Sequence, residues 1–530
     1  MAKKTPHILM VAAENGALVG GKVGGVADVV RDLPRALAAQ GLKVTVVTPN
    51  YGFLNEQNPA KAAGGVEFPF CGRTEYAEIH EVKPKGTPKN VKHVVLENIW
   101  MRGAPIYFND PPWRAFAADA SKYAMLCSAV GRAVVEGVGP FKGVDVIHLH
   151  DWHAATLALL RDVHPAFDGL RGIRTVYTIH NLAIQGTRPV EDHESSLGAW
   201  FPELMLDSAL RSRVYSDFAD YRYGHPSYCP MLVGIRHADA VTTVSPTYAR
   251  EIQQPSDPDS GFFGGEGLEY WIRQADGDGR LFGIINGVEY PDDYKPPRLT
   301  FAKLREKIEK ETAALLEADP ANDKLKAAME RVAAWKGRKA KVIVTAVSRV
   351  ADQKTRLLFE NATDGANGFD RVMEQITAAG GVFILLGKGI EGMEAHLLAL
   401  MSRHENFLFI NGTSIEIANR LIAGGQLFLM PSLFEPCGIG QMLAMRDGQP
   451  PLVHSVGGLA DTVKDGEDGF AFTGAGIHGK VDGMLETLDR ALTCIAKDKK
   501  TYKAICETAA SRRFDWAGSA AAYKADVYGV

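Results

Sequence analysis

Cysteine is scarce in this chain of 530 residues, which has six cysteines and no C-x-x-C pair. Such wide spacing disfavours a disulfide scaffold and is typical of reduced thiols, so we expect a cytoplasmic protein. Long apolar runs are also missing, because no stretch approaches the ~20 residues of a membrane span. The opening MAKKTPHILMVAAENG contains only the short run ILMVAA, which predicts a first β-strand and not a signal peptide.

Charge of one sign is not in excess either, since the formal net charge is −4. This balance disfavours nucleic acid as the main partner. Neither a Gly-x-Ser-x-Gly motif nor a Walker loop is present. The composition, 46% hydrophobic and 23% charged, is ordinary for a globular protein with a full core, and the length predicts two or three domains.

Short β-branched runs alternate with helical patterns almost throughout the chain. Bounded by Gly, Pro or His, such runs indicate parallel sheets covered by helices on both faces. The first half has runs at 7–13, 43–49, 145–150, 175–180 and 240–246, and the second half has runs at 341–349, 382–387, 406–412, 427–432 and 451–455. The predicted fold class is α/β, with doubly wound, Rossmann-like domains.

Composition also suggests domain boundaries. PDDYKPPRLT at 291–300 is proline-rich and polar, so we predict a linker there between an N-terminal domain (1–290) and a C-terminal domain (301–505). Residues 301–337 predict charged helices laid over the second domain, and the last stretch, 506–530, predicts a closing helix.

One sequence pattern occurs in both halves. VGGVADVV at 23–30 and VGGLADTV at 456–463 agree at six of eight positions. Chance similarity in text rich in Gly, Ala and Val is one explanation. The other is that each half opens a helix with a glycine loop, as expected for two similar domains that face a cleft beyond the carboxyl ends of their strands.

Two patterns suggest sites but lack supporting residues. Gly387-x-Gly389-x-x-Gly392 matches the dinucleotide fingerprint, yet no acidic residue follows at the end of the next strand to hold a ribose. His148 and His150 would share one face of a strand, but a single strand seldom encloses an ion, and no further ligand cluster is visible. We therefore expect neither a nicotinamide cofactor nor a metal.

The residues after the HLH run suggest a different role. Asp151 and His153 are predicted to lie on the loop that leaves the strand. Ligands of open α/β sheets sit beyond the carboxyl ends of the strands. We expect these two side chains to face the cleft and bind a polar substrate.

A glycine loop carries the first candidate for anion binding. Lys22 stands beside Gly24 and Gly25 at the predicted start of a helix. Glycines let the backbone approach a ligand, and a helix N-terminus offers free N–H groups with partial positive charge. The alternative is a plain strand–helix turn with a surface lysine.

A second basic pair follows the first strand of the C-terminal domain. Arg349 and Lys354, in SRVADQK, suit a diphosphate, one as a planar fork and the other as a point charge. A solvated basic pair is the alternative explanation.

Glu435, in FEPCGIGQ, ends an apolar strand, where a carboxylate is costly unless something there uses it. Pro436 fits the first position of a helix, which would leave the amides of Gly438, Ile439 and Gly440 free. Glu435 could serve as a simple helix cap. Opposite a diphosphate site, it could instead hold sugar hydroxyls while the amides receive phosphate.

Eight motifs in order identify a family: KVGGVADVV, HDWHAA, YTIHNLAIQG, VSPTYAREI, GIINGVE, SRVADQK, PSLFEPCG and GGLADTV. They cover nearly the whole chain and resemble the bacterial glycogen synthases and plant starch synthases that use ADP-glucose. The resemblance implies the GT-B fold, two Rossmann-like domains facing a cleft. It also implies a metal-independent, cofactor-free, retaining transfer of glucose to the 4-hydroxyl at the non-reducing end of an α-1,4-glucan.

The same resemblance assigns roles to single residues. It places Lys22, Gly24 and Gly25 at the donor diphosphate and cleft edge, and Glu435 at the donor glucose. Phosphate binding is implied for Arg349 and Lys354, with help from the amides near Gly438. The sugar site would be lined by Asp151 and His180.

Several positions depart from the family pattern, and they put base recognition and acceptor contacts in question. The departures are Val23, Ser227, Leu232, Thr413, Gln426, Gly440 and Leu443, together with extra residues after Lys354. Thr413 stands where a tyrosine that stacks on adenine is expected. The alternatives are therefore UDP-glucose or another nucleotide sugar as donor, another acceptor, or a non-catalytic glucan-binding relative.

Overall fold

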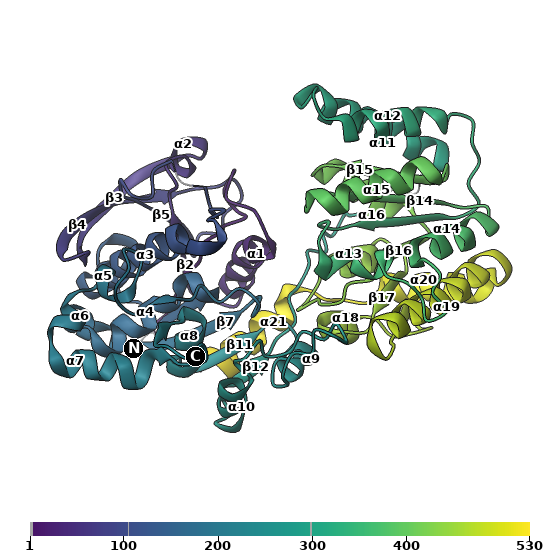
Figure 1. Cartoon of the computed structure of the whole chain (residues 1–530). Coiled ribbons are helices and arrows are strands. Elements are labelled where there is room, and N and C mark those ends of the chain that lie inside the picture. Colours follow the sequence, from purple (N-terminus) through teal and green to yellow (C-terminus); the bar gives the residue numbers. More distant parts are fainter. Residues whose placement is uncertain (1–3, 104, 297–298) are drawn as a thin grey trace.

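The computed structural model describes residues 4–103, 105–296 and 299–530. The chain forms two α/β lobes, each built around its own sheet (Figure 1). The predicted linker 291–300 includes residues 297–298, which lie outside the described residues. Its described part contains neither helix nor strand.

The N-terminal lobe contains a sheet of nine strands, ordered β12-β11-β7-β6-β1-β2-β5-β4-β3. Pairing is parallel from β12 to β5, and β4 is antiparallel to both of its neighbours. The strands are β1 (His7–Val11), β2 (Lys43–Pro49), β3 (Ala60–Phe70), β4 (Arg73–Val82), β5 (Val91–Glu97), β6 (Val146–His150), β7 (Arg174–Ile179), β11 (Ala240–Thr243) and β12 (Leu281–Gly283). A small second sheet is formed by β8 (Arg188–Pro189), β10 (Ser227–Tyr228) and β9 (Ala219–Asp220).

The C-terminal lobe contains a parallel sheet of six strands, ordered β15-β14-β13-β16-β17-β18. The strands are β13 (Ile343–Val347), β14 (Val382–Gly387), β15 (Phe407–Asn411), β16 (Leu427–Met430), β17 (Pro451–His454) and β18 (Phe470–Phe472). In both lobes the strand order reverses beside the first strand, so each sheet is doubly wound and its ligand edge is the carboxyl one.

Helices cover both faces of the two sheets. The N-terminal lobe has α1 (Gly25–Ala39), α2 (Leu54–Gln57), α3 (Ala117–Glu136), α4 (Asp151–Val163), α5 (Leu197–Trp200), α6 (Glu203–Leu206), α7 (Ser208–Arg213), α8 (Pro230–His237), α9 (Pro246–Glu251) and α10 (Glu269–Gly277). The C-terminal lobe has α11 (Phe301–Ala318), α12 (Asp323–Ala334), α13 (Asp352–Phe359), α14 (Gly368–Ala378), α15 (Glu391–Arg403), α16 (Ile415–Gly424), α17 (Gly440–Arg446), α18 (Gly457–Thr462), α19 (Gly476–Lys497) and α20 (Lys499–Ser511).

All ten predicted strands are present, and both glycine repeats open a helix, α1 and α18. The sequence reasoning missed β5, which adds to the parallel part of the N-terminal sheet, and β4 and β3, which extend it as an antiparallel edge. It also missed the short strands β8, β9, β10, β12 and β18. β3 begins with small exposed residues, and β4 alternates exposed and buried positions. Neither β3 nor β4 is a continuous apolar run, because its outer face meets water.

The end of the chain returns to the N-terminal lobe. After α20, α21 (Trp516–Ala522) and the π-helical turn η5 (Tyr523–Tyr528) pack beside α1, as the yellow segment between the lobes in Figure 1 shows. The Tyr528 hydroxyl contacts His148 Nδ1 at 2.8 Å, and Arg174 Nε donates to the Val527 carbonyl at 2.7 Å. The described chain thus crosses between the lobes a second time near its end.

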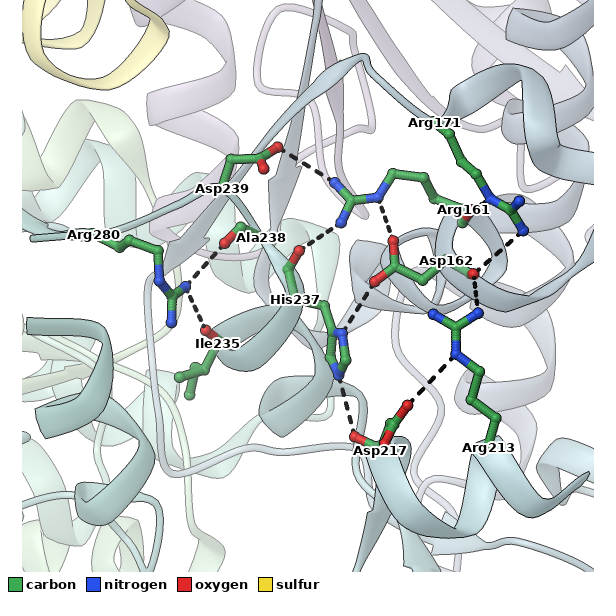
Figure 2. A network of polar contacts seen from close by, with 10 residues as sticks. All are labelled: Arg161, Asp162, Arg171, Arg213, Asp217, Ile235, His237, Ala238, Asp239 and Arg280. Carbon is green, nitrogen blue, oxygen red and sulfur yellow. Dashed lines mark hydrogen bonds and ion pairs between the residues drawn. The ribbon is translucent and has the colours of Figure 1, made fainter. Parts of the chain in front are cut away.

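A network of arginines and aspartates secures the amino edge of the N-terminal sheet (Figure 2). Arg161 at the end of α4 donates to Asp162 at 2.7 Å and to the His237 carbonyl at 2.7 Å, and it pairs with Asp239 at 3.4 Å. Asp239 also accepts from the Thr175 amide, at 2.7 Å, beside the start of β7. These bonds fasten α4 and α8 to the strand starts, on the edge opposite the ligand edge.

The six cysteines are all free. In the described ranges, no helix combines the length and apolarity needed to cross a membrane.

Replacing Trp516 by alanine tests whether packing of the returning segment stabilises the N-terminal lobe. Its side chain is buried against that lobe, whereas Trp113 is 84% exposed. We expect Trp516→Ala to lower the free energy of unfolding of that lobe by about 3–5 kcal/mol, because a large buried ring leaves a cavity. Trp113→Ala should change it by less than about 0.5 kcal/mol. Thermal unfolding of both variants measures the difference, and equal melting temperatures would contradict this packing.

Candidate active site

The C-terminal half of the site is formed where two neighbouring strands end. β13 pairs with β16 in parallel, so the segments that follow their carboxyl ends meet at one edge of the sheet. Arg349 and Lys354 follow β13, and Glu435 follows β16. The structure brings Lys354 and Glu435 into direct contact, while Arg349 is exposed beside them and its Nη2 lies 3.5 Å from Gln353.

The carboxylate of Glu435 is paired with a lysine inside the protein. Its Oε2 accepts hydrogen bonds from Lys354 Nζ and, at 3.2 Å, from Ser432 Oγ. The side chains of Lys354 and Glu435 are only 15% and 7% exposed. A buried carboxylate is tolerated when a cation and further donors satisfy it, and removing either partner leaves an uncompensated charge. The Glu435 carboxylate accepts no hydrogen bond from a backbone amide in the described chain, so the helix-cap explanation is wrong.

The prediction that Pro436 begins a helix is also wrong. Helix α17 begins at Gly440, and the residues before it form an irregular turn in which Gly438 has φ +77°. This left-handed conformation favours glycine. The amides of Gly438, Ile439 and Gly440 donate to no acceptor within the described ranges, and these residues are partly exposed. They remain available to an anion, as expected.

In the N-terminal half, Lys22 stands three residues before α1, a helix on the side of its lobe that faces the other lobe (Figure 1). Its Nζ is 2.7 Å from both oxygens of Asp28, and its side chain is 49% exposed. Gly24 is the N-cap of α1 and Gly25 is its first residue. A Cβ added at Gly25 would meet no atom within 4 Å. Lys22 is therefore an exposed lysine at a helix start, held by one aspartate.

Glu14 occupies part of the anion-binding position expected at α1. Its Oε2 accepts from the amides of Val23 at 2.6 Å and Gly24 at 2.5 Å. These two N–H groups were predicted to be free, and the structure shows that they are bonded. Its Oε1 accepts from the Tyr107 hydroxyl at 2.7 Å. The sequence reasoning missed Glu14 and Tyr107. The signal for Glu14 was present: like Glu435, it is a carboxylate just beyond a buried strand.

Asp151 begins α4 directly after β6, with φ +55°. It was expected on a loop with His153, but both residues lie in the first turn of α4. Oδ1 of Asp151 accepts from the His180 amide at 2.7 Å, so this carboxylate fixes the turn after β7. Burial raises its pKa to about 7, with a further upward effect from the nearby Glu14 carboxylate.

His180 and His150 form a neutral pair at the ends of β7 and β6. His180 Nε2 lies 2.9 Å from His150 Nδ1, and burial lowers the pKa of His180 to about 3. One ring nitrogen therefore donates and the other accepts. Within the described ranges, no group of three or more His, Cys, Asp or Glu residues could hold a metal ion.

The two half-sites stay separate in this structure. Glu14, Lys22, Asp151 and His180 surround the carboxyl ends of β1, β6 and β7, and Arg349, Lys354 and Glu435 surround those of β13 and β16. Among described residues, no hydrogen bond or ion pair joins one of these groups to the other.

The departures from the family pattern lie in different surroundings. Thr413 is exposed, just after the carboxyl end of β15. Gln426 lies before β16, where its Oε1 accepts from the Ile343 amide at 2.7 Å. Leu232 and Ser227 are buried in the N-terminal lobe, and Leu443 packs in α17.

Comparison with known families agrees with this geometry. Residues 7–274 match the starch synthase catalytic domain family, and residues 355–490 match the family of glycosyl transferases group 1. A protein named glycogen synthase from Desulfitobacterium hafniense is 33% identical over 519 residues, which cover 96% of each chain. Another, from Francisella philomiragia, is 30% identical over 507 residues, which cover 94% of this chain and 95% of the relative.

Solved structures give the same result for the fold. The catalytic domain of starch synthase IV from Arabidopsis thaliana, bound to ADP and acarbose, matches with a TM-score of 0.75 and 25% identity, over 99% of both chains. A sucrose-phosphate synthase from Thermosynechococcus elongatus shares the fold at a TM-score of 0.53 and 16% identity, over 98% of this chain and 97% of the other. The predicted GT-B fold is confirmed. The chain belongs to the glycogen and starch synthase family of glycosyltransferases.

Proposed function

We propose that this protein is a retaining glucosyltransferase that moves glucose from ADP-glucose to the 4-hydroxyl at the non-reducing end of an α-1,4-glucan. Family membership supports the reaction class. The observation that carries the proposal is the buried Lys354–Glu435 pair beside Arg349, at the carboxyl edge of the C-terminal sheet. ADP in the related starch synthase structure supports ADP as the nucleotide.

The C-terminal half-site would hold the donor. Arg349 and Lys354 bind the diphosphate, and the free amides at Gly438–Gly440 assist them. Glu435 accepts hydrogen bonds from hydroxyls of the donor glucose. Because Lys354 also binds Glu435, one lysine links the sugar subsite to the phosphate subsite.

The N-terminal half-site would hold the acceptor and the far side of the donor. Lys22, Gly24 and Gly25 lie at the diphosphate, and His180 lines the sugar site on a turn that Asp151 fixes. With its pKa near 3, His180 is neutral at physiological pH and offers a hydrogen bond without a charge.

The chemistry we infer is a front-face displacement. As the anomeric bond loosens, positive charge develops on the sugar and negative charge on the leaving diphosphate. Fixed cations at the leaving group stabilise that charge without reorganising. The departing phosphate oxygen takes the proton of the acceptor hydroxyl, so the transfer needs no side-chain base.

The direct test is turnover, with Glu435→Ala as the critical variant. ADP release from ADP-glucose should require glycogen, and Glu435→Ala should lower kcat by about a hundredfold or more, the order expected when one preorganised contact is lost. As a control, Asp498→Ala removes a true helix cap, that of α20, and should cost ~1 kcal/mol of stability with little change in kcat. Nearly normal turnover by Glu435→Ala would refute its catalytic role.

We predict that turnover needs no divalent metal, because Arg349 and Lys354 supply positive charge at the leaving group. Enzyme treated with EDTA should keep its full rate, measured with ADP-glucose and glycogen. Loss of activity that Mg²⁺ or Mn²⁺ restores would contradict this prediction.

Thr413 provides a test of nucleotide recognition. A stacked aromatic ring on a base contributes about 1–3 kcal/mol, and threonine cannot supply it. We expect ADP-glucose to be preferred over UDP-glucose, but weakly. Thr413→Tyr should lower KM for ADP-glucose about fivefold or more and leave kcat nearly unchanged, because stacking on a non-reacting base is equal in ground and transition states. Strict rejection of UDP-glucose by the unmodified protein, with an unchanged KM in the variant, would mean that another residue reads the base.

A further inference from the structure

Helix α9 of the N-terminal lobe lies directly against the turn that carries Glu435. The helix belongs to the VSPTYAREI segment and packs on α18 of the other lobe. Figure 1 shows α9 and α18 in the region where the two lobes meet. Three parts of α9 reach the Glu435 turn or the loop behind it.

The first contact is made by the cap of the helix. Ser245 Oγ accepts from the Tyr248 amide at 3.2 Å and donates to the Pro436 carbonyl at 2.6 Å. Ser245 is fully buried. One hydroxyl therefore caps the start of the helix and also fixes the backbone next to Glu435.

The second contact reaches one turn from each half-site through a single residue, although the site residues themselves do not touch. The Tyr248 ring packs against Phe434 with 5.4 Å between ring centroids, and the Tyr248 hydroxyl accepts from the Leu182 amide at 3.1 Å. Leu182 follows His180 by two residues, and Phe434 precedes Glu435 by one. A single buried side chain thus touches the turn of His180 and the turn of Glu435.

The third contact comes from the last residue of the helix. Glu251 Oε1 accepts from the Gly457 amide at 2.9 Å. Gly457 has φ +45°, and a Cβ there would collide with the carbonyl oxygen of Glu435. The next amide, of Gly458, donates to the Glu435 carbonyl at 3.1 Å and to the Pro436 carbonyl at 3.2 Å. Glu251 therefore holds the loop on which the backbone of Glu435 rests.

The charges around Glu251 favour a role as hydrogen-bond acceptor and not as counterion. Burial raises its pKa to about 7, and the nearby Asp461 raises it further, opposed by the Gly457 amide and by Arg250. Asp461 itself is held by α9, through the Thr247 amide at 2.8 Å and the Thr247 hydroxyl at 2.7 Å. A neutral side chain of the same shape should therefore serve in place of Glu251.

We propose that α9 sets the position of Glu435 relative to the N-terminal half-site, and that Glu251 is a positioning residue for Glu435. The assignment rests on the proposed function for the role of Glu435 in turnover. Its structural content, that Glu251 orders residues 433–441 through Gly457, does not depend on that role.

The test compares Glu251→Ala, which removes the acceptor, with Glu251→Gln, which keeps an acceptor oxygen. A displacement of about 1 Å can cost on the order of a hundredfold in rate. We expect Glu251→Ala to lower kcat by about tenfold to a hundredfold and to change KM for glycogen by less than about twofold. Glu251→Gln should recover kcat to within about threefold of the unmodified enzyme.

Glu203→Ala is the matched control. Glu203 is another partly buried carboxylate of the N-terminal lobe that accepts a hydrogen bond, from His164, and α6 lies on the side away from the C-terminal lobe. The Glu203→Ala variant should be less stable than the unmodified protein but should keep the same kcat. In the Glu435→Ala background, adding Glu251→Ala should cost less than about twofold, because residues that act as a unit are not additive.

Amide hydrogen exchange separates this inference from the proposed function. Residues 433–441 should exchange faster in Glu251→Ala than in the unmodified protein, and Glu203→Ala should leave them unchanged. Faster exchange in a protein that does not turn over ADP-glucose would support the positioning contact and refute the proposed function. Unchanged exchange, or a Glu251→Ala variant with full kcat, would overturn the positioning role.

Discussion

Burying the carboxylate of Glu435 is the constraint on which the proposed donor site depends. Taking one charge out of water costs several kcal/mol, and the cost is offset only by a well-placed opposite charge with additional donors. Lys354 and Ser432 meet that requirement. Because Lys354 follows β13 and Glu435 follows β16, the parallel pairing of these strands sets the geometry of the ion pair. A rigid sheet thus fixes the two groups on which we place the donor chemistry.

The N-terminal lobe also buries carboxylates, and there backbone amides and a tyrosine hydroxyl bind them. Glu14, beyond β1, is held by the amides at the start of α1 and by Tyr107, and Asp151, beyond β6, is held by the amide of His180. In each lobe the polar groups lie at the carboxyl ends of central strands, as expected for doubly wound sheets. Two further contacts hold the lobes together. Helix α9 of the N-terminal lobe packs on α18, and the returning segment α21–η5 packs on the N-terminal lobe.

Much of this arrangement could be predicted from the sequence, because buried parallel strands appear as continuous apolar runs. The strand ends at Arg349 and Glu435 were found that way. The antiparallel edge strands β3 and β4 were missed because one face of each meets water. The course of the turn at Pro436 could not be predicted, since its carbonyls are held by the amide of Gly458, about twenty positions further on, and by Ser245 of the N-terminal lobe. Local preference placed a proline at a helix start, and tertiary contacts overrode it.

The residues that depart from the family pattern differ in how near they lie to the carboxyl edge of the sheet, where a ligand would bind. Gln426 precedes β16, a strand of four residues, so roughly 13 Å of strand separates it from the carboxyl edge. The Gln426 side chain accepts a hydrogen bond from the Ile343 amide at the start of β13. It cannot reach a ligand at the opposite edge. Leu232 fills the core of the N-terminal lobe.

Thr413 differs from both, since it is exposed and lies at the carboxyl edge that we assign to the donor. Lys354 and Glu435 form a buried contact in the interior beyond the ends of β13 and β16, where packing limits change. The nucleotide base is not itself transformed, so its subsite can vary at the surface without disturbing that interior. Among Gln426, Leu232 and Thr413, only Thr413 is exposed at the edge that we assign to the donor, so we expect it alone to alter donor choice while leaving the reacting groups as they are.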